Sequence, residues 1–166
     1  PRIVYFVGGK EACENASQRF WEALREELVQ QQYVDDISTA MDKQVFLYQS
    51  MMKGLPILTP PNLKYNVPTV IRVEPSANRG GDNHCGRGFF LECFLDNLEE
   101  LVPWVEAKDQ TLSYWGFEQK TIHELIASIN GKGIDRAVPV GRALNFTSIW
   151  DGYILLTELT KCILVL

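Results

Sequence analysis

Apolar residues recur along the chain with two alternating periods, and these periods predict strands and helices in turn. Residues 2–7 are mostly β-branched or aromatic and end at Gly8-Gly9, which predicts a buried strand. Apolar residues then recur every three or four positions, which predicts helices over residues 11–31 and 36–52. The recurring residues of the second helix are Ile37, Met41, Val45, Tyr48 and Met52. We expect the three methionines of this region, Met41, Met51 and Met52, to belong to the core.

The rest of the chain continues the alternation after a proline-rich connection at residues 55–68 and a loop rich in Gly, Asn and Asp at residues 75–88. Further strands are predicted at residues 67–74, 89–94, 111–117, 136–140 and 162–165. Further helices are predicted from the caps Asp96-Asn97, Thr121 and Asp151, ending near Val105, Gly131 and Lys161.

Strands that alternate with helices, several of them apolar on both faces, indicate a sheet covered by helices on both sides. We therefore expect a single α/β domain over residues 1–166, with a largely parallel sheet and helices on both faces. Because the sequence opens directly on a strand, we also expect it to be part of a longer two-domain protein.

Composition narrows the classes of function. Hydrophobic residues make up 46% of the chain and charged residues 22%, as in ordinary globular proteins. The net charge of −5, with no basic run, argues against nucleic-acid binding, and no apolar stretch is long enough to span a membrane. The four cysteines are scattered without a CxxC motif, so neither a metal site nor a disulfide framework is expected, and a reducing cytoplasm is the natural location.

The loop at residues 79–88 (Arg-Gly-Gly-Asp-Asn-His-Cys-Gly-Arg-Gly) is the local sequence most suggestive of function. Its four glycines let the backbone approach a ligand, and its two arginines could meet phosphate. A plain surface loop explains it equally well, because no dinucleotide or phosphate-binding fingerprint is present. His84 and Cys85 are adjacent, so their side chains are not expected to form a nucleophile and base. His123, inside a helix, is expected at the surface or half-buried.

Three segments resemble the C-terminal part of the acyl-CoA reductase family that supplies fatty aldehyde in bacterial bioluminescence, within the aldehyde dehydrogenase superfamily. Residues 1–7, with the helix that follows, resemble the strand and helix just after the catalytic cysteine. Residues 89–101 resemble a later strand that leads into a helix. Residues 133–141 (Gly-Ile-Asp-Arg-Ala-Val-Pro-Val-Gly), with Asn145-Phe146 and residues 149–152 (Ile-Trp-Asp-Gly), resemble the closing motif of the family most closely.

This resemblance implies a fold like the aldehyde dehydrogenase catalytic domain and an oxidoreductase activity. The implied reaction is NADPH-dependent reduction of an acyl-CoA or acyl-protein thioester to a fatty aldehyde through an acyl-cysteine intermediate. It places the nucleophile upstream of this chain, so no catalytic residue is expected within it, and it assigns NADPH mainly to a preceding domain. By position, His84, Cys85 and Gly86 become the cofactor-binding candidates. Enzymes of this kind are often homo-oligomers or parts of multienzyme complexes.

The residues themselves leave other functions open. A non-catalytic α/β binding or assembly module would have the same pattern of strands and helices. A separate acyl- or phosphate-binding enzyme could also be built around the Gly80–Gly88 loop.

Overall fold

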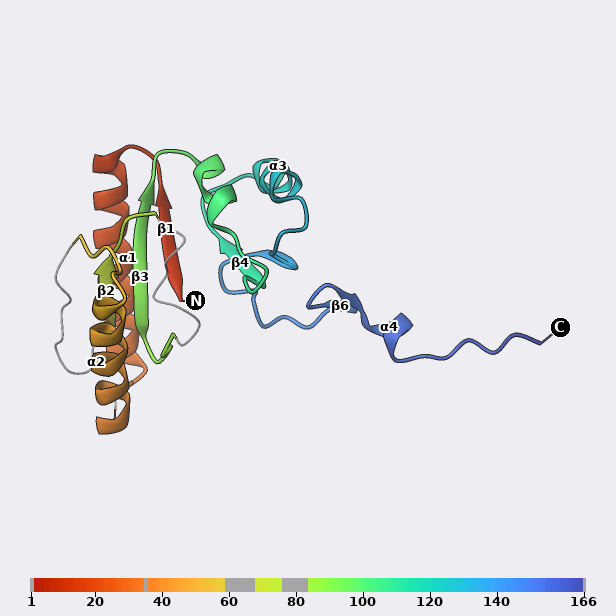
Figure 1. The fold of residues 1–166 in the computed structure, drawn as a ribbon, viewed down its shortest axis with the longest axis horizontal. Coiled ribbons are helices and arrows are strands. Elements are labelled where there is room, and N and C mark those ends of the chain that lie inside the picture. The colour runs from red at the N-terminus through yellow and green to blue at the C-terminus, as the bar shows by residue number, and fades with distance from the viewer. Residues whose placement is uncertain (1, 35, 59–67, 76–83, 166) are drawn as a thin grey trace. The chain divides into compact units, whose positions relative to one another are not determined.

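The computed structural model describes residues 2–34, 36–58, 68–75 and 84–165 (Figure 1). Its elements are β1 Ile3–Val7, α1 Lys10–Gln30, α2 Ile37–Met52, β2 Thr69–Arg72, β3 Phe89–Leu95, the 3-10 helix η1 Leu98–Trp104, β4 Thr111–Tyr114, α3 Gln119–Ile129, β5 Arg136–Pro139, β6 Ile149–Trp150, β7 Tyr153–Ile154 and α4 Leu155–Glu158. Most of the proline-rich connection (59–67) and the first part of the glycine-rich loop (76–83, with Arg79 and Gly80) lie outside the described residues.

The chain divides into two compact units, Pro1–Leu98 and Glu99–Leu166. The first unit contains a three-stranded sheet in the order β1-β3-β2, and both strand pairs are parallel. The second unit contains the parallel pair β4-β5 and the antiparallel hairpin β6-β7. The fold is thus mixed α/β with a small parallel sheet, and among the described residues it has no single sheet that runs through the chain.

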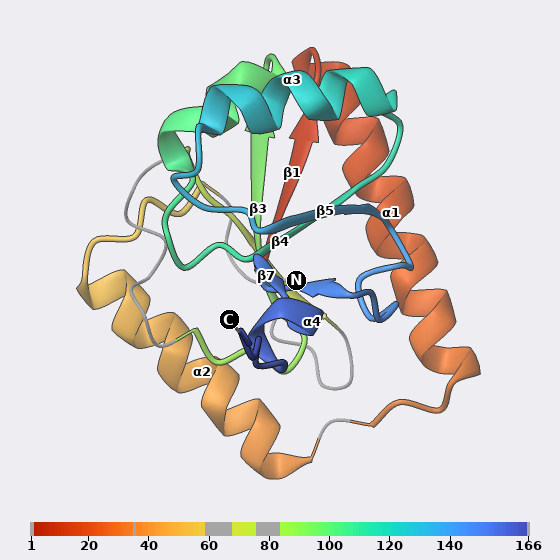
Figure 2. The same ribbon diagram turned by 90° about the vertical axis from the view of Figure 1, so that its right-hand side faces the viewer.

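Helices cover both faces of the three-stranded sheet, as the apolar strands predicted (Figure 2). Successive side chains of β3 point to opposite faces. Phe90 and Glu92 contact Trp21 of α1. Phe89, on the opposite face, contacts Phe46 of α2.

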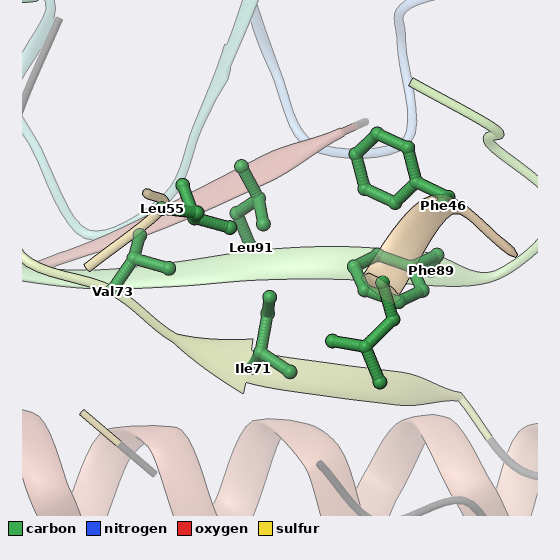
Figure 3. Packing of buried hydrophobic residues seen from close by; sticks show 7 residues of the cluster. Phe46, Leu55, Ile71, Val73, Phe89 and Leu91 are labelled. Atoms are coloured by element: carbon green, nitrogen blue, oxygen red, sulfur yellow. The ribbon is translucent and has the colours of Figure 1, made fainter. Parts of the chain in front are cut away.

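The core of the first unit forms on the α2 side of the sheet (Figure 3). Its buried members come from α2, the segment that follows it and the two strands β2 and β3: Phe46, Leu47, Leu55, Ile71, Val73, Phe89 and Leu91. Strand pairing brings part of this core together, because Ile71 of β2 lies directly beside Leu91 of β3. Ile3 of β1 and Cys85 pack against its margin.

The prediction that the methionines of α2 belong to the core is wrong. Met41, Met51 and Met52 are exposed, and so are Ile37, Val45 and Tyr48. The face that α2 buries instead carries Thr39, Lys43, Phe46, Leu47 and Ser50. The helix therefore has an apolar stripe that points away from its own core.

In the second unit, α3 and η1 bury aliphatic side chains that include Leu101, Ile122, Leu125 and Ile129. The short helix predicted after Asp96-Asn97 is present as the 3-10 helix η1. One prediction needs correction. Thr121 does not cap α3, because the helix begins at Gln119 after Glu118.

The end of the chain also differs from the prediction. Asp151 has a φ of +51° in the turn between β6 and β7, so it does not cap a helix. The only helix there is the short α4, and residues 162–165 are exposed and form no strand. The local pattern suggested a strand, but these residues have no neighbouring strand to pair with in the described structure. No helix in the described part of the chain is both long enough and apolar enough to cross a membrane.

Candidate functional site

The segment of residues 84–88 leads directly into β3 and has an unusual backbone. Gly86, Arg87 and Gly88 have φ values of +66°, +50° and +74°, a region where glycine is favoured because it has no Cβ. The Phe89 N–H donates to the Gly86 carbonyl at 2.8 Å, and the Thr69 N–H donates to the Gly88 carbonyl at 2.9 Å. These bonds fix the turn at the start of β3 and beside β2.

His84 packs against the core in a neutral state. Its ring centroid lies 4.7 Å from that of Phe46 and 5.8 Å from that of Phe89. Burial, assisted by the positive charge of Arg2, lowers the pKa of His84 to about 4. Nδ1 accepts a hydrogen bond from the Gly86 N–H at 3.0 Å, so the proton of the neutral ring is on Nε2. Nε2 is buried and has no hydrogen-bond partner among the described residues.

Cys85 is not poised as a nucleophile. Burial raises the pKa of its thiol, and the Sγ atom lies 3.6 Å from the Gly86 carbonyl oxygen, to which it can donate a weak hydrogen bond. Activated cysteines have a lowered pKa beside a base or positive charge. His84 cannot serve as that base, because its Nδ1 is engaged and its Nε2 already carries the proton.

Two cationic side chains, Arg87 and Lys43, lie where residues 84–88 meet α2. The guanidinium of Arg87 lies 3.2 Å from the Asp42 carboxylate and donates to the Thr39 hydroxyl at 3.1 Å. Lys43 is buried, and its Nζ lies next to Gly88, 3.5 Å from where a Cβ would stand. Arg87 is therefore committed to holding the turn against α2, and we assign it no ligand.

The three sequence-predicted candidates, His84, Cys85 and Gly86, thus lie together in one tight turn. The turn offers one neutral donor, the Nε2–H of His84, but no base and no thiolate. Because Nε2 is buried, this donor is not exposed to a ligand in solution. Gly86 contributes through its backbone, since its N–H fixes the His84 tautomer.

A second polar cluster, between α1 and the sheet, was missed by sequence reasoning. Glu92 is 3% exposed, and its carboxylate accepts hydrogen bonds from Ser17 (2.5 Å), Trp21 (2.5 Å) and Arg72 (2.7 Å). Arg72 also forms a bidentate pair with Glu14 at 2.7 and 2.9 Å. The signal available in the sequence was one charged residue inside each of two apolar strands, Arg72 in β2 and Glu92 in β3.

The hydrogen bonds and ion pairs within this cluster indicate that its role is structural. Burial acts to lower the pKa of Arg72, but its hydrogen bonds to Glu14 and Glu92 outweigh burial and raise the pKa above its ordinary value. The guanidinium also lies 4.0 Å from the ring centroid of Phe94. The one guanidinium thus lies beside both carboxylates, and the buried carboxylate of Glu92 has the cation that a buried charge requires.

The segment that resembles the closing motif of the reductases is held together by its own members. Arg136 donates to the carbonyls of Arg142 (3.4 Å), Ala143 (3.0 Å) and Asn145, and its guanidinium lies 4.8 Å from the ring centroid of Trp150. Phe146 stacks on Trp150 at 5.5 Å. A Cβ on Gly152 would touch the Asp135 side chain, and one on Gly133 would overlap the Glu106 carbonyl.

The remaining cysteines show no activating surroundings. Cys13 is buried, and its pKa is raised by burial and then by the charges of Asp96 and Glu14. Cys93 is buried and contacts the carbonyl of Phe94, and Cys162 is exposed. Within the described ranges, no group of three His, Cys, Asp or Glu side chains could hold a metal ion.

Comparison with known proteins adds no family assignment. No protein-family model matches the sequence, and no curated protein matches it.

Proposed function

We propose that this chain is part of an NADPH-dependent acyl-CoA reductase that converts a fatty acyl thioester to an aldehyde through a cysteine-bound acyl intermediate. The observation that carries the proposal is the contact set of residues 133–152. Arg136, Phe146 and Trp150 were singled out by resemblance to the family's closing motif, and Trp150 contacts both of the others. The members of the motif thus form one structural unit.

The cysteines are consistent with a nucleophile that lies elsewhere in the protein. Acyl transfer needs a thiolate, and the pKa values of Cys13 and Cys85 are shifted away from thiolate formation. The aldehyde-dehydrogenase-like fold is likewise part of the proposal, and the parallel α/β sheet of the first unit is compatible with it.

The described residues do not fit the cofactor's pyrophosphate. Arg72 and Arg87 are paired with carboxylates, and the glycines beside His84 do not precede a helix. The proposal therefore assigns NADPH to a preceding domain, and His84, Cys85 and Gly86 remain candidates for a minor contact only.

The test measures NADPH-dependent aldehyde formation by the complete protein from acyl-CoA substrates that cover short to long chains. We expect aldehyde from at least one chain length and a stable acyl-enzyme when NADPH is omitted. Absence of aldehyde at every chain length would refute the proposal.

A matched set of variants then locates the nucleophile. Cys13→Ser, Cys85→Ser, Cys93→Ser and Cys162→Ser should each retain labelling by radioactive acyl-CoA. Loss of labelling in any one of them would show that the nucleophile is in this chain. If all four variants keep their labelling and the parent protein is active, the result supports a nucleophile outside this chain.

A second candidate is a non-catalytic binding or assembly module. It is favoured by the observation that the Glu92 cluster and the Arg87 contacts are satisfied internally. It predicts ligand or partner binding without turnover, so the aldehyde assay separates the two functions.

A further inference from the structure

The outer face of α2 carries a continuous apolar stripe. Ile37, Met41, Val45, Tyr48 and Met52 are 74%, 60%, 50%, 56% and 87% exposed. At 3.6 residues per turn these positions lie on one side of the helix, opposite the buried residues Lys43, Phe46 and Ser50. The stripe is therefore a second apolar face that the core of its own unit does not use.

The order of residues in the stripe is self-complementary. The last four members are separated by four, three and four residues, the spacing of positions that alternate along a coiled-coil seam. If a second α2 runs antiparallel, Met41 faces Tyr48 and Ile37 faces Met52. Val45, near the centre, then faces its own copy. A single antiparallel register thus gives every residue of the stripe an apolar partner.

Charge favours the same arrangement. Three positions beside the stripe, Ser38, Gln44 and Gln49, are uncharged. The carboxylate of Asp42, further round the helix, is paired with Arg87, which offsets its charge. Asp36 caps the N-terminal end of α2 and accepts the Thr39 N–H at 2.6 Å, whereas Lys53 is at the C-terminal end. Antiparallel packing brings these ends of opposite charge and opposite helix dipole together, and parallel packing brings like ends together.

We propose that the exposed face of α2 is an isologous dimer interface, in which two copies of this chain pack their α2 helices antiparallel with the two-fold axis near Val45. This interface is independent of the function proposed above. A 16-residue helix is about 24 Å long, so the contact is smaller than the roughly 800 Å² per partner of a standard stable complex. The dimer is therefore expected to be concentration-dependent, with a Kd in the micromolar range.

The first experiment measures the mass of the complete protein in solution against concentration by sedimentation equilibrium. The parent should pass from monomer to dimer, and Val45→Arg should weaken association at least tenfold. Val29→Arg is the matched control, because Val29 is 78% exposed on α1 and lies outside the stripe. A parent that stays monomeric, or a dimer that both variants weaken equally, overturns the proposal.

The second experiment tests the register with single cysteines in a background that carries Cys162→Ser, because Cys162 is the exposed native thiol. Val45→Cys should cross-link to itself with a short bismaleimide. Ile37→Cys alone should not, since its two copies would be about 22 Å apart. A mixture of Ile37→Cys and Met52→Cys should cross-link. Failure of Val45→Cys to exceed the background, or equal cross-linking by Ile37→Cys alone, overturns the antiparallel register.

Discussion

At the residue scale, Glu92 shows how one charged side chain organises an otherwise apolar strand. It lies in the sequence Phe-Phe-Leu-Glu-Cys-Phe-Leu, and the register of β2 and β3 places Arg72 directly opposite it. The carboxylate is buried, so its stability depends on Arg72, Ser17 and Trp21. A buried ion pair adds little net stability, but removal of one partner leaves an uncompensated charge.

Replacement of Arg72 by Met should therefore lower the free energy of unfolding by about 3–5 kcal/mol, measured by urea denaturation. Lys120→Met is the control, because Lys120 is 83% exposed and lies 3.8 Å from Glu124, and it should change stability by no more than about 0.5 kcal/mol. The double variant Arg72→Met/Glu92→Met should recover part of the loss. A loss below about 1 kcal/mol for Arg72→Met would mean that Glu92 is not buried as the structure has it.

His84 should make stability fall in mild acid. Its folded-state pKa of about 4 lies below the ordinary value of 6.5, so the unfolded chain takes up the proton first as pH falls. The contribution of the neutral ring is complete above about pH 6.5 and is lost as pH falls toward 4. His84→Phe should flatten this part of the stability curve, because it fills the aromatic contact without a titrating group.

The measurement is the difference in unfolding free energy between parent and His84→Phe from pH 4 to 7.5. A nuclear magnetic resonance titration gives the pKa directly, because the chain has two histidines and the variant identifies one of them. A difference that stays constant over this range, or a His84 pKa near 6.5, would contradict the buried placement of the ring.

At the element scale, the two glycines between α3 and β5 should respond very differently to the same substitution. Gly131 has a φ of +72° with open space around it, so Gly131→Ala adds backbone strain alone, about 1–2 kcal/mol. At Gly133 a Cβ would overlap the backbone carbonyl of Glu106, which cannot move without displacing the segment before β4. Gly133→Ala should therefore lower stability by roughly 3 kcal/mol or more.

Thermal and urea unfolding of the two variants, monitored by circular dichroism, gives the comparison. Each variant serves as the other's control, since both add one methyl group within three residues. Equal losses would show that the close approach of residues 106 and 133 is absent in solution.

The elements that sequence alone predicted well are those with a strong period and a glycine at the boundary. β1 and α1 match the predicted strand and helix to within one residue at each end, because apolar runs on either side of Gly8-Gly9 leave little alternative. β3 was equally clear from its continuous apolar sequence. The period of α2 also gave the helix correctly, but it could not tell which face the protein covers.

The predictions that failed concern features that depend on tertiary contacts. The buried face of α2 includes Thr39, Lys43 and Ser50, so it looked polar beside the more regular apolar stripe. The pairing of Arg72 with Glu92 depends on strand register, which no local pattern gives. The hairpin at residues 149–154 replaced a predicted helix because Asp151 adopts a positive φ in its turn. For the candidate site, sequence placed His84, Cys85 and Gly86 together but could not give their protonation.

At the scale of the whole molecule, the described charges predict weak binding of NADPH by this chain alone. Tight binding of a dinucleotide needs free backbone N–H groups at a helix N-terminus for the pyrophosphate. At the β1–α1 turn the Gly8 N–H already donates to Leu95, and Glu11 lies in the first turn of α1. The net charge of −5 adds repulsion.

Calorimetric titration of this chain with NADPH should therefore give a Kd weaker than about 1 mM. The complete protein, titrated in parallel, should bind in the micromolar range if a preceding domain holds the cofactor. Micromolar binding by this chain alone would contradict the proposal that a preceding domain binds NADPH, because it would require a pyrophosphate site within residues 1–166. Weak binding by both would leave the Glu92 cluster and the α2 stripe intact as structural features but would argue for the assembly module over the reductase.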